Sequence, residues 1–461
     1  MENQNSRQKI ALLRPATTIA LSFAILIAIG TLLLSIPACR VDKAIVPYNA
    51  FFTATSAVCV TGLVVEDTGT TYTTFGQIVI LLLIQLGGLG YMTVATVVAI
   101  ILGKEPGVTE RITLKESYGL QKLSGVVRLT RNTLFFTLIC EAIGAIILML
   151  RFAATTAISG WQAVYYGIFH SVSAFCNAGF DIMGPEYGKF SSLTNFVSDP
   201  VISFIIPALF IIGGLGYPVV EEIIRGKKRK WSLHAKLVIL TSIALLFLGT
   251  FAIMTLEWSN PDTLRGMSFT QKLMSSFFQS ATCRTAGFNT LDIGSFHATT
   301  LAIMGMLMFI GASPGGTGGG VKTTTIVLMI IAVISIIRGK QDSEIFGKRI
   351  PQENINKALA ISIVAALIVI ICTIMLTFTE VDFINPKHKA NFVDVQFEAL
   401  SAWGTVGLST GITPDLCSFG RIVIIILMFV GRIGPLTAFA ALAFREKPVK
   451  RRLAEENVVI G

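Results

Sequence analysis

The stretch Ser401–Ser409 reads SAWGTVGLS, and three related strings precede it along the chain. They are SAVCVTGLV at 56–64, SAFCNAGFD at 173–181 and SATCRTAGFN at 280–289. The glycines of the four strings lie about 110 to 120 residues apart: Gly62, Gly179, Gly287 and Gly407. Recurrence at a nearly fixed period indicates an internal repeat. The third string carries one additional residue between its Ser-Ala pair and its glycine.

Apolar segments surround these strings. Of the 461 residues, 53% are hydrophobic and only 14% are charged, whereas soluble domains have about 25% charged residues. Runs near the ~20 residues that cross a bilayer recur from Thr17–Pro37 to Ile422–Phe444. The first run is longer than the core of a signal peptide and further runs follow it, so we expect a retained helix. The composition therefore predicts a multi-pass membrane protein.

Basic residues gather in five blocks between the apolar pairs. The blocks are Arg7, Lys9 and Arg14; Lys104, Arg111, Lys115, Lys122, Arg128 and Arg131; Arg225, Lys227, Lys228, Arg229, Lys230 and Lys236; Arg338, Lys340, Lys348, Arg349 and Lys357; and Arg445, Lys447, Lys450, Arg451 and Arg452. The positive-inside rule makes all five cytoplasmic, with both termini inside the cell. The net charge of +10 is then a signal of topology and predicts no nucleic-acid partner.

Each interval between basic blocks holds an apolar helix, a shorter half-apolar stretch, a glycine-containing segment and a second apolar helix. We expect four such units, at 1–103, 104–225, 226–338 and 339–461, the last with a cytoplasmic tail. The predicted fold is an all-α polytopic membrane protein with eight transmembrane helices, built as four tandem helix–pore loop–helix repeats around a central pore. The short stretches, at 48–57, 163–174, 269–281 and 392–402, suit half-helices that stop near mid-membrane.

After each half-helix, extended residues that end in glycine can turn carbonyl oxygens toward a common axis. Potassium channels coordinate their ion in this way, and inward-pointing helix C-termini add partial negative charge. The predicted K+ selectivity filter comprises Cys59, Val60, Thr61, Gly62, Cys176, Asn177, Ala178, Gly179, Arg284, Thr285, Ala286, Gly287, Gly404, Thr405, Val406 and Gly407. The alternative is four structural loops without a role in conduction. Because only the glycine recurs in all four strings, we expect weaker selectivity than in fourfold TVGYG channels.

The second helices also carry related small-residue strings, which allow either close packing or a break in the helix. They start at Gly87, Gly213, Gly311 and Gly431. The third begins GASPGGTGGG and predicts an intramembrane loop over 311–321, because glycine and proline disfavour a helix. Its gate candidates are Gly311, Ala312, Ser313, Pro314, Gly315, Gly316, Thr317, Gly318, Gly319, Gly320 and Lys322. A phosphate-binding loop fits poorly, since Val321 separates Gly320 from Lys322 and no strand precedes it.

Arg432 lies inside the last apolar run, where a charge usually faces a water-filled pathway or the interior of the bundle. Facing a pore, it would repel cations and form part of a gate. The alternative is a buried ion pair with Glu141 or Glu398. Outside the strings, Asp67 and Asp292 could attract cations or be ordinary loop acids.

Four longer stretches together resemble the Ktr-type membrane subunit of the Ktr/Trk/HKT potassium transporter superfamily. They are TGLVVEDTGT (61–70), TAGFNTLDIG (285–294), GTVGLSTGITP (404–414) and FVGRIGPLT (429–437). The similarity covers about Pro15 to Phe444. It implies four linked modules around one pore in the cell membrane, filters that keep essentially the glycine, and a gate made by the 311–321 loop and Arg432.

The resemblance also implies partners. They are a second copy of the chain in a homodimer, membrane lipid, and a cytoplasmic ring of nucleotide-binding regulatory subunits similar to KtrA, of RCK type. The transported ion would be K+, with Na+ as a possible activator, and no covalent cofactor is implied.

Two other functions are weighed against conduction. A sodium-coupled or sodium-conducting secondary transporter with discontinuous helices predicts inverted repeats, whereas here every copy starts and ends inside and the copies are parallel. A membrane-embedded enzyme needs a cluster of His, Asp or Glu, but the four histidines are far apart in the sequence. The seven cysteines form no CxxC pair and indicate neither zinc nor a disulfide framework. We therefore expect no enzyme activity.

Overall fold

The structure is a computed structural model that describes residues 15–90, 93, 96, 106–117, 125–155, 158, 160–226, 231–340, 342–380, 390–435 and 437–438. Within these residues the regular elements are helices apart from one short hairpin, in which β1 (Glu344–Ile345) pairs with β2 (Lys348–Arg349). The predicted basic residues at 7–14, 104, 122, 227–230 and 445–452, and both termini, lie outside the described residues.

Four long helices form the outer framework. They are α2 (Pro15–Leu34), α8 (Val126–Ala153), α13 (Leu233–Leu256) and α17 (Gln352–Glu380). All four are long and apolar enough to cross a membrane. Large apolar side chains such as Leu32 and Phe247 stay 72% and 73% exposed on them. Because water would make such exposure costly, this surface fits contact with lipid chains.

Four shorter helices lie inside this framework. They are α3 (Pro47–Val58), α9 (Gly160–Phe175), α14 (Phe269–Thr282) and α18 (Phe392–Gly404), and each covers one of the predicted half-helix stretches. Capping boxes at Ser268 and Asn391 fix the starts of α14 and α18. All four end in the glycine strings.

The second helices of the four units are broken at equivalent places. They are α5 (Thr74–Leu89), the bent pair α11 (Pro200–Leu215) and α12 (Tyr217–Ile224), the pair α15 (Ala298–Phe309) and α16 (Thr323–Ile337), and α19 (Ser418–Ile433). The breaks at Gly90, Gly216 and Gly434 have φ of 80°, 86° and 90°, which glycine adopts freely. Between α11 and α12 the bend is 102°.

Close packing accompanies the break, so both expectations for the small-residue strings are met. A Cβ on Gly87 or Gly213 would lie 2.0–2.1 Å from the last carbonyl of α3 or α9, and one on Gly431 would lie 2.0 Å from Trp403 O, next to the end of α18. Glycine therefore allows the second helices of the first, second and fourth units to approach the ends of their short helices.

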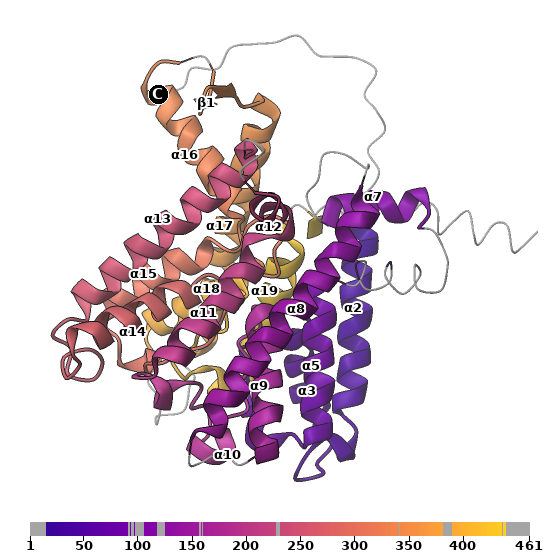
Figure 1. Ribbon diagram of the computed structural model, residues 1–461, viewed down its shortest axis with the longest axis vertical. Helices are drawn as coiled ribbons and strands as arrows, with labels where there is room; N and C mark the ends of the chain where they lie inside the picture. The colour runs from indigo at the N-terminus through magenta and orange to yellow at the C-terminus, as the bar shows by residue number, and fades with distance from the viewer. Residues whose placement is uncertain are drawn as a thin grey trace, which may run out of the picture.

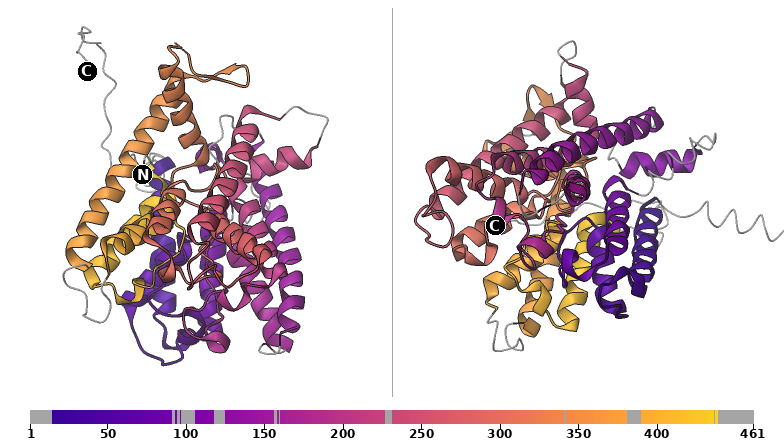
Figure 2. Two further views of the ribbon diagram at one scale, coloured as in Figure 1. Left: turned by 90° about the vertical axis from the view of Figure 1, so that its left-hand side faces the viewer. Right: turned by 60° about the horizontal axis from the view of Figure 1, so that its bottom comes forward.

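The four groups of helices surround one centre in chain order, as the indigo, magenta, salmon and yellow ribbons of the right-hand view in Figure 2 show. The helix α7 (Val108–Ser117), the helix α12 and the β1–β2 hairpin lie at one end of the molecule, and the short helix α10 (Gly184–Tyr187) lies at the other (Figure 1). Described basic residues Arg111, Arg225 and Lys348 belong to the first end. These connectors carry basic residues that the positive-inside rule assigns to the cytoplasmic side.

Acidic side chains at the opposite end fasten long helices to the second helices. Glu257, at the end of α13, accepts hydrogen bonds from the His297 amide at 3.0 Å and from the Thr300 hydroxyl at the start of α15. Glu380 of α17 accepts from the Cys417 amide at 3.2 Å, and Asp199 of α11 pairs with Arg151 of α8 at 2.5 Å. These contacts position the second helices of the second, third and fourth units against their long helices.

Candidate functional site: the four-glycine ring and the loop beside it

The glycines of the four strings form a closed ring at the centre of the molecule. A Cβ on Gly62 would lie 2.5 Å from Ala178 O, one on Gly179 would lie 2.7 Å from Ala286 O, and one on Gly287 would lie 2.5 Å from Val406 O. The ring closes because a Cβ on Gly407 would lie 2.1 Å from Thr61 O. Each string thus touches the next through a carbonyl oxygen.

The backbone of the strings departs from helical geometry at two positions. The four glycines have φ of 93°, 69°, 82° and 93°. Two residues earlier, Val60, Asn177, Thr285 and Thr405 also have positive φ, at 50°, 59°, 64° and 49°. Non-glycine residues seldom adopt this region, and such strain gathers at functional sites where the surroundings enforce it.

Hydroxyl groups at the ends of the short helices hold the strings in place. The Gly62 and Gly407 amides donate to Ser56 Oγ and Ser401 Oγ, each at 3.1 Å. Ser173 Oγ donates to Phe180 O at 2.7 Å, and Thr282 Oγ1 donates to Phe288 O at 2.6 Å. These anchors were not among the predicted site residues, although the recurring serine was their signal.

The contacts of the third string also show where its additional residue lies. Ser280 instead donates to Leu246 O at 3.0 Å, on the long helix behind it. Thr282, two residues later, takes the anchoring role. Because α3 and α14 both end two residues after the Ser of their string, at Val58 and Thr282, the additional residue lies between the end of α14 and Gly287.

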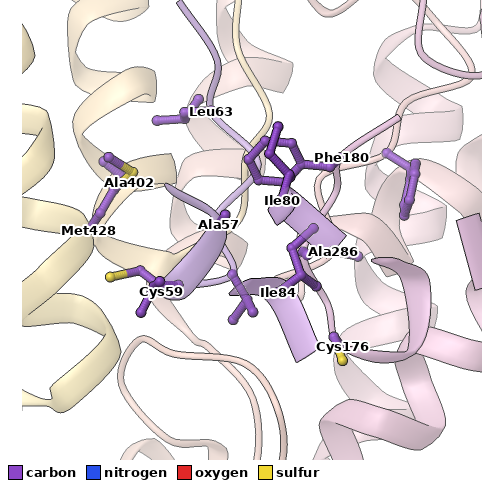
Figure 3. Close-up of a cluster of buried hydrophobic side chains, with 14 of the residues drawn as sticks. Ala57, Cys59, Leu63, Ile80, Ile84, Cys176, Phe180, Ala286, Ala402 and Met428 are labelled. Atoms are coloured by element: carbon purple, nitrogen blue, oxygen red, sulfur yellow. The ribbon is translucent and has the colours of Figure 1, made fainter. Parts of the chain in front are cut away.

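Small and aromatic side chains pack around the strings, with members from all four units in one cluster. Figure 3 shows Ala57, Phe180, Ala286 and Ala402 within it, with Met428 of α19 beside Ala402. Ala57, Ala286 and Ala402 are fully buried. Close packing of this kind keeps the carbonyl ring rigid.

The first residue of each predicted filter segment packs away from the ring. Cys176 Sγ lies 3.4 Å from Gln85 Oε1 and 3.8 Å from Glu141 Oε1. A Cβ on Gly404 would lie 2.4 Å from Met308 O. Cys59 is fully buried, and Arg284 is 7% exposed with a side-chain Nε that has no partner among the described residues. Arg284 meets the neighbouring string through its carbonyl, which accepts from Asn177 Nδ2 at 3.4 Å.

The segment 311–321 forms an ordered loop between α15 and α16. Its ends are tied by a bond from the Gly311 amide to Val321 O at 2.9 Å. The Ser313 and Thr317 amides donate to Gly214 O and Gly213 O at 3.0 and 3.1 Å. The Gly320 amide donates to Gly431 O at 3.1 Å. The loop is therefore docked on the second helices of the second and fourth units.

Glycine is required at the tip of this loop. A Cβ on Gly318 would lie 1.9 Å from Thr285 Oγ1, and one on Gly319 would lie 2.6 Å from Thr405 Oγ1. The loop thus presses directly on two of the strings. No side chain fits between them.

Arg432 connects the loop to the first unit. Its guanidinium donates to Thr317 O and Gly87 O, and to Gly88 O at 3.2 Å. Lys322 caps α16, and its Nζ donates to Gly318 O at 2.7 Å. Arg432 thus binds carbonyl groups of the loop and of α5, and Lys322 binds a carbonyl group of the loop.

The predicted alternative partners of Arg432 are engaged elsewhere. Glu141 accepts from Gln85 Nε2 at 3.2 Å. Glu398 accepts from Ser409 Oγ at 2.6 Å and from the Thr413 hydroxyl. Among the contacts that the described residues make, Arg432 is held by backbone carbonyls rather than by either acid.

The two outer acids serve as helix caps. Asp67 accepts from the Thr70 amide at 2.8 Å and from the Phe190 amide of the second unit at 2.9 Å. Asp292 accepts from the Gly294 amide at 3.2 Å and from Ser295 Oγ at 2.7 Å. Both carboxylates are explained by local structure.

A cavity of about 430 Å³ lies against the loop and the ends of the second helices. Phe23, Gly88, Tyr217, Lys322 and Arg432 are among the residues that line it. The arrangement is a ring of carbonyls, a seated loop beside it, and a cavity that contains two cationic side chains.

Known proteins share both the sequence and the fold. The TrkH family, described as cation transport proteins, matches residues 1–449. The chain is 40% identical over 435 residues to the Ktr system potassium uptake protein B of Bacillus subtilis, which covers 94% of each chain. It is 36% identical to the potassium/sodium uptake protein NtpJ of Enterococcus hirae, over 97% of this chain and 98% of the relative. The crystal structure of the potassium transporter TrkH from Vibrio parahaemolyticus superposes with a TM-score of 0.68 at 18% identity, over 92% of this chain and 84% of the other.

Proposed function

Because the chain belongs to the TrkH family of cation transport proteins, we propose that it takes up potassium ions across a cell membrane, through the axis of the four-glycine ring. The observation that carries the proposal is the closed contact of Gly62, Gly179, Gly287 and Gly407 with one another's neighbouring carbonyls. Rings of backbone carbonyls replace the hydration shell of K+ in known channels. Relatives named as uptake proteins over nearly their whole length support transport rather than enzyme chemistry.

The filter in this proposal consists of the residues that the sequence nominates around the four glycines. Among these residues, Thr61, Ala178, Ala286 and Val406 offer the carbonyls nearest to the neighbouring glycines. The loop and Arg432 form the barrier beside it. A guanidinium in the cavity opposes an approaching cation, and the loop occupies the space next to the strings.

The wider assembly is also a proposal. A second copy of the chain would complete a homodimer, and a cytoplasmic ring of nucleotide-binding subunits would move the loop. The word "system" in the names of the Bacillus subtilis and Vibrio alginolyticus relatives supports a partner. Basic connectors at one end of the molecule provide a surface for such a partner and for anionic lipid.

Flux into liposomes that contain the purified chain tests the proposal. Rubidium and sodium uptake under an imposed gradient would be measured for the wild type, Gly407→Ser and Gly411→Ser. Gly411 has a φ of 97°, close to the 93° of Gly407, but among the residues that the structure describes nothing lies within 4 Å of a Cβ built on it. The two variants thus share the backbone penalty and differ in the collision with Thr61 O.

We expect the wild type to favour rubidium, Gly407→Ser to lose about tenfold of that preference, equal to ~1.4 kcal/mol, and Gly411→Ser to keep it. Equal preference in all three proteins would remove the ring from the conduction path. Sodium flux that exceeds rubidium flux in the wild type would favour the alternative of a sodium transporter, a reading that the name of the Enterococcus hirae relative keeps open.

A further inference from the structure

The seated loop contacts side chains of the strings as well as backbone. Thr317 Oγ1 lies 2.7 Å from Asn177 Oδ1, to which it donates, and 3.3 Å from Phe175 O. The Gly319 amide donates to Thr405 Oγ1 at 2.9 Å. Two adjacent stretches of the loop are therefore bonded to two different units of the ring.

The residues contacted in this way occupy one equivalent position. We call Val60, Asn177, Thr285 and Thr405 the inner ring; each precedes its glycine by two residues and has a positive φ. All four are fully buried. Asn177 Nδ2 donates to Thr285 Oγ1 at 3.1 Å, so neighbouring members of the inner ring are also bonded to each other.

The inner ring is asymmetric, because only the members that the loop contacts are polar. Its three polar members belong to the second, third and fourth units, which are the ones that Thr317, Gly318 and Gly319 touch. The member from the first unit is Val60, whose side chain can make no hydrogen bond. In the first unit, Arg432 instead donates hydrogen bonds to Gly87 O and Gly88 O at the end of α5.

Because buried oxygens must be paired, the state of the loop decides what these side chains bind. With the loop seated, Asn177 Oδ1 and Thr405 Oγ1 accept from Thr317 and Gly319. Without the loop, the same two oxygens lose their donors. A cation at this end of the ring is a partner that oxygen acceptors can take in place of the donors.

We propose that Thr317 is a positioning residue that couples the seating of the loop to the cation preference of the inner ring. The inference rests on the proposed function, since it needs the strings to conduct cations. Coupling between two sites is reciprocal. A cation bound at the inner ring therefore favours the unseated loop, and loss of the Thr317 hydroxyl changes selectivity as well as flux.

The chain offers a matched control in Thr323. This residue is also fully buried at the base of the loop, and its hydroxyl lies 2.9 Å from Ser313 Oγ. That bond lies within the loop and its edge and does not reach the inner ring. Thr323→Val therefore removes a hydroxyl of the same kind and leaves the coupling contact intact.

The experiment compares wild type, Thr317→Val, Thr317→Ser and Thr323→Val as full chains in liposomes. Rubidium and sodium flux are measured without any partner protein, and unfolding temperatures in detergent verify that each variant is folded. We expect Thr317→Val to raise flux and to shift the rubidium-to-sodium ratio, each by about tenfold as for the loss of one well-formed hydrogen bond. Thr317→Ser should restore both quantities, and Thr323→Val should leave the ratio unchanged.

A flux increase in both valine variants with an unchanged ion ratio would overturn the coupling, because the loop would then act as a plain barrier. No change in Thr317→Val would also overturn it. If Thr317→Val does not fold, Thr405→Val removes the acceptor on the other side of the loop, and a ratio equal to that of the wild type would count against the proposal. Absence of cation flux from the wild type as well as every variant would instead overturn the proposed function itself.

Discussion

Arg432 is held by three carbonyl oxygens that belong to two separate elements, the loop and the end of α5. The sequence could predict its importance, because an arginine in an apolar run is costly. It could not choose between a gate and an ion pair, because the choice depends on which helix faces it across the bundle. The same limit applies to Asn177 and Thr405, whose bonds to the loop join residues far apart in the chain.

The geometry of Arg432 allows its charge and its bridging to be separated. Arg432→Lys keeps the charge, but lysine lacks the planar fork that can reach carbonyls on two elements. We expect Arg432→Ala to raise partner-free rubidium flux about tenfold, the effect of ~1.4 kcal/mol, and Arg432→Lys to fall between. Arg421→Ala is the control. Arg421 lies on the same helix as Arg432, but its guanidinium binds Leu416 O and Pro414 O at 2.9 Å, away from the loop.

Liposome flux measurements on the three variants distinguish the possibilities. If Arg432→Lys behaves like the wild type, charge alone suffices and the bridge is incidental. If Arg432→Ala conducts no more than Arg421→Ala, the arginine is structural.

At the scale of elements, the short helices were predicted almost to their ends because their apolar stretches stop at recurring strings. The breaks in the second helices were harder to predict from the sequence, since small residues suit both close packing and a bend. In the third unit the break is widened into a whole loop between α15 and α16. Only the surrounding helices determine where that loop docks.

The equivalent breaks make a second prediction about the loop. A Cβ on Gly216 would lie 2.5 Å from Pro314 O, whereas no described residue comes within 4 Å of one on Gly90. Gly216→Ala and Gly90→Ala share the penalty for a positive φ combined with a ψ of 131°, about 1–3 kcal/mol. We expect Gly216→Ala alone to unseat the loop and to raise partner-free flux severalfold. Similar fluxes in the two variants would show that the bend, rather than its contact with the loop, matters.

The acids that fasten the helices predict a change in stability. Glu257 is fully buried and also accepts from Asn260 Nδ2 and Thr263 Oγ1, at 2.6 and 2.9 Å. Its removal leaves several donors unpaired, so Glu257→Ala should lower the free energy of unfolding by about 3 kcal/mol. Glu353 forms only an exposed pair with Lys357, and Glu353→Ala should leave the unfolding temperature in detergent unchanged. An equal effect of both substitutions would contradict the fastening role.

For the whole molecule, one chain supplies four units that surround an axis without being identical. Recurrence of the strings allowed the all-α membrane fold and the central ring to be predicted from sequence. The proposed regulation rests on the departures from symmetry: the valine in the first unit, the loop in the third and the arginine in the fourth. They were visible as residues, but their contacts with one another depend on the assembled ring.

The distribution of lysines between the two ends makes the orientation testable. Lys340 and Lys348 are exposed at the end that carries the basic connectors, and Lys43 and Lys189 are exposed in connectors at the other end. Positive-inside topology places the first pair in the cytoplasm. A membrane-impermeant amine reagent applied to inside-out vesicles should therefore modify Lys340 and Lys348, whereas intact cells stripped of their wall should yield Lys43 and Lys189. Peptide mass spectrometry reads both patterns. Labelling of both pairs from one side would contradict the crossing of the membrane between them. The reverse pattern would show that the protein has the opposite orientation in the membrane, with the loop on the outer side of the ring.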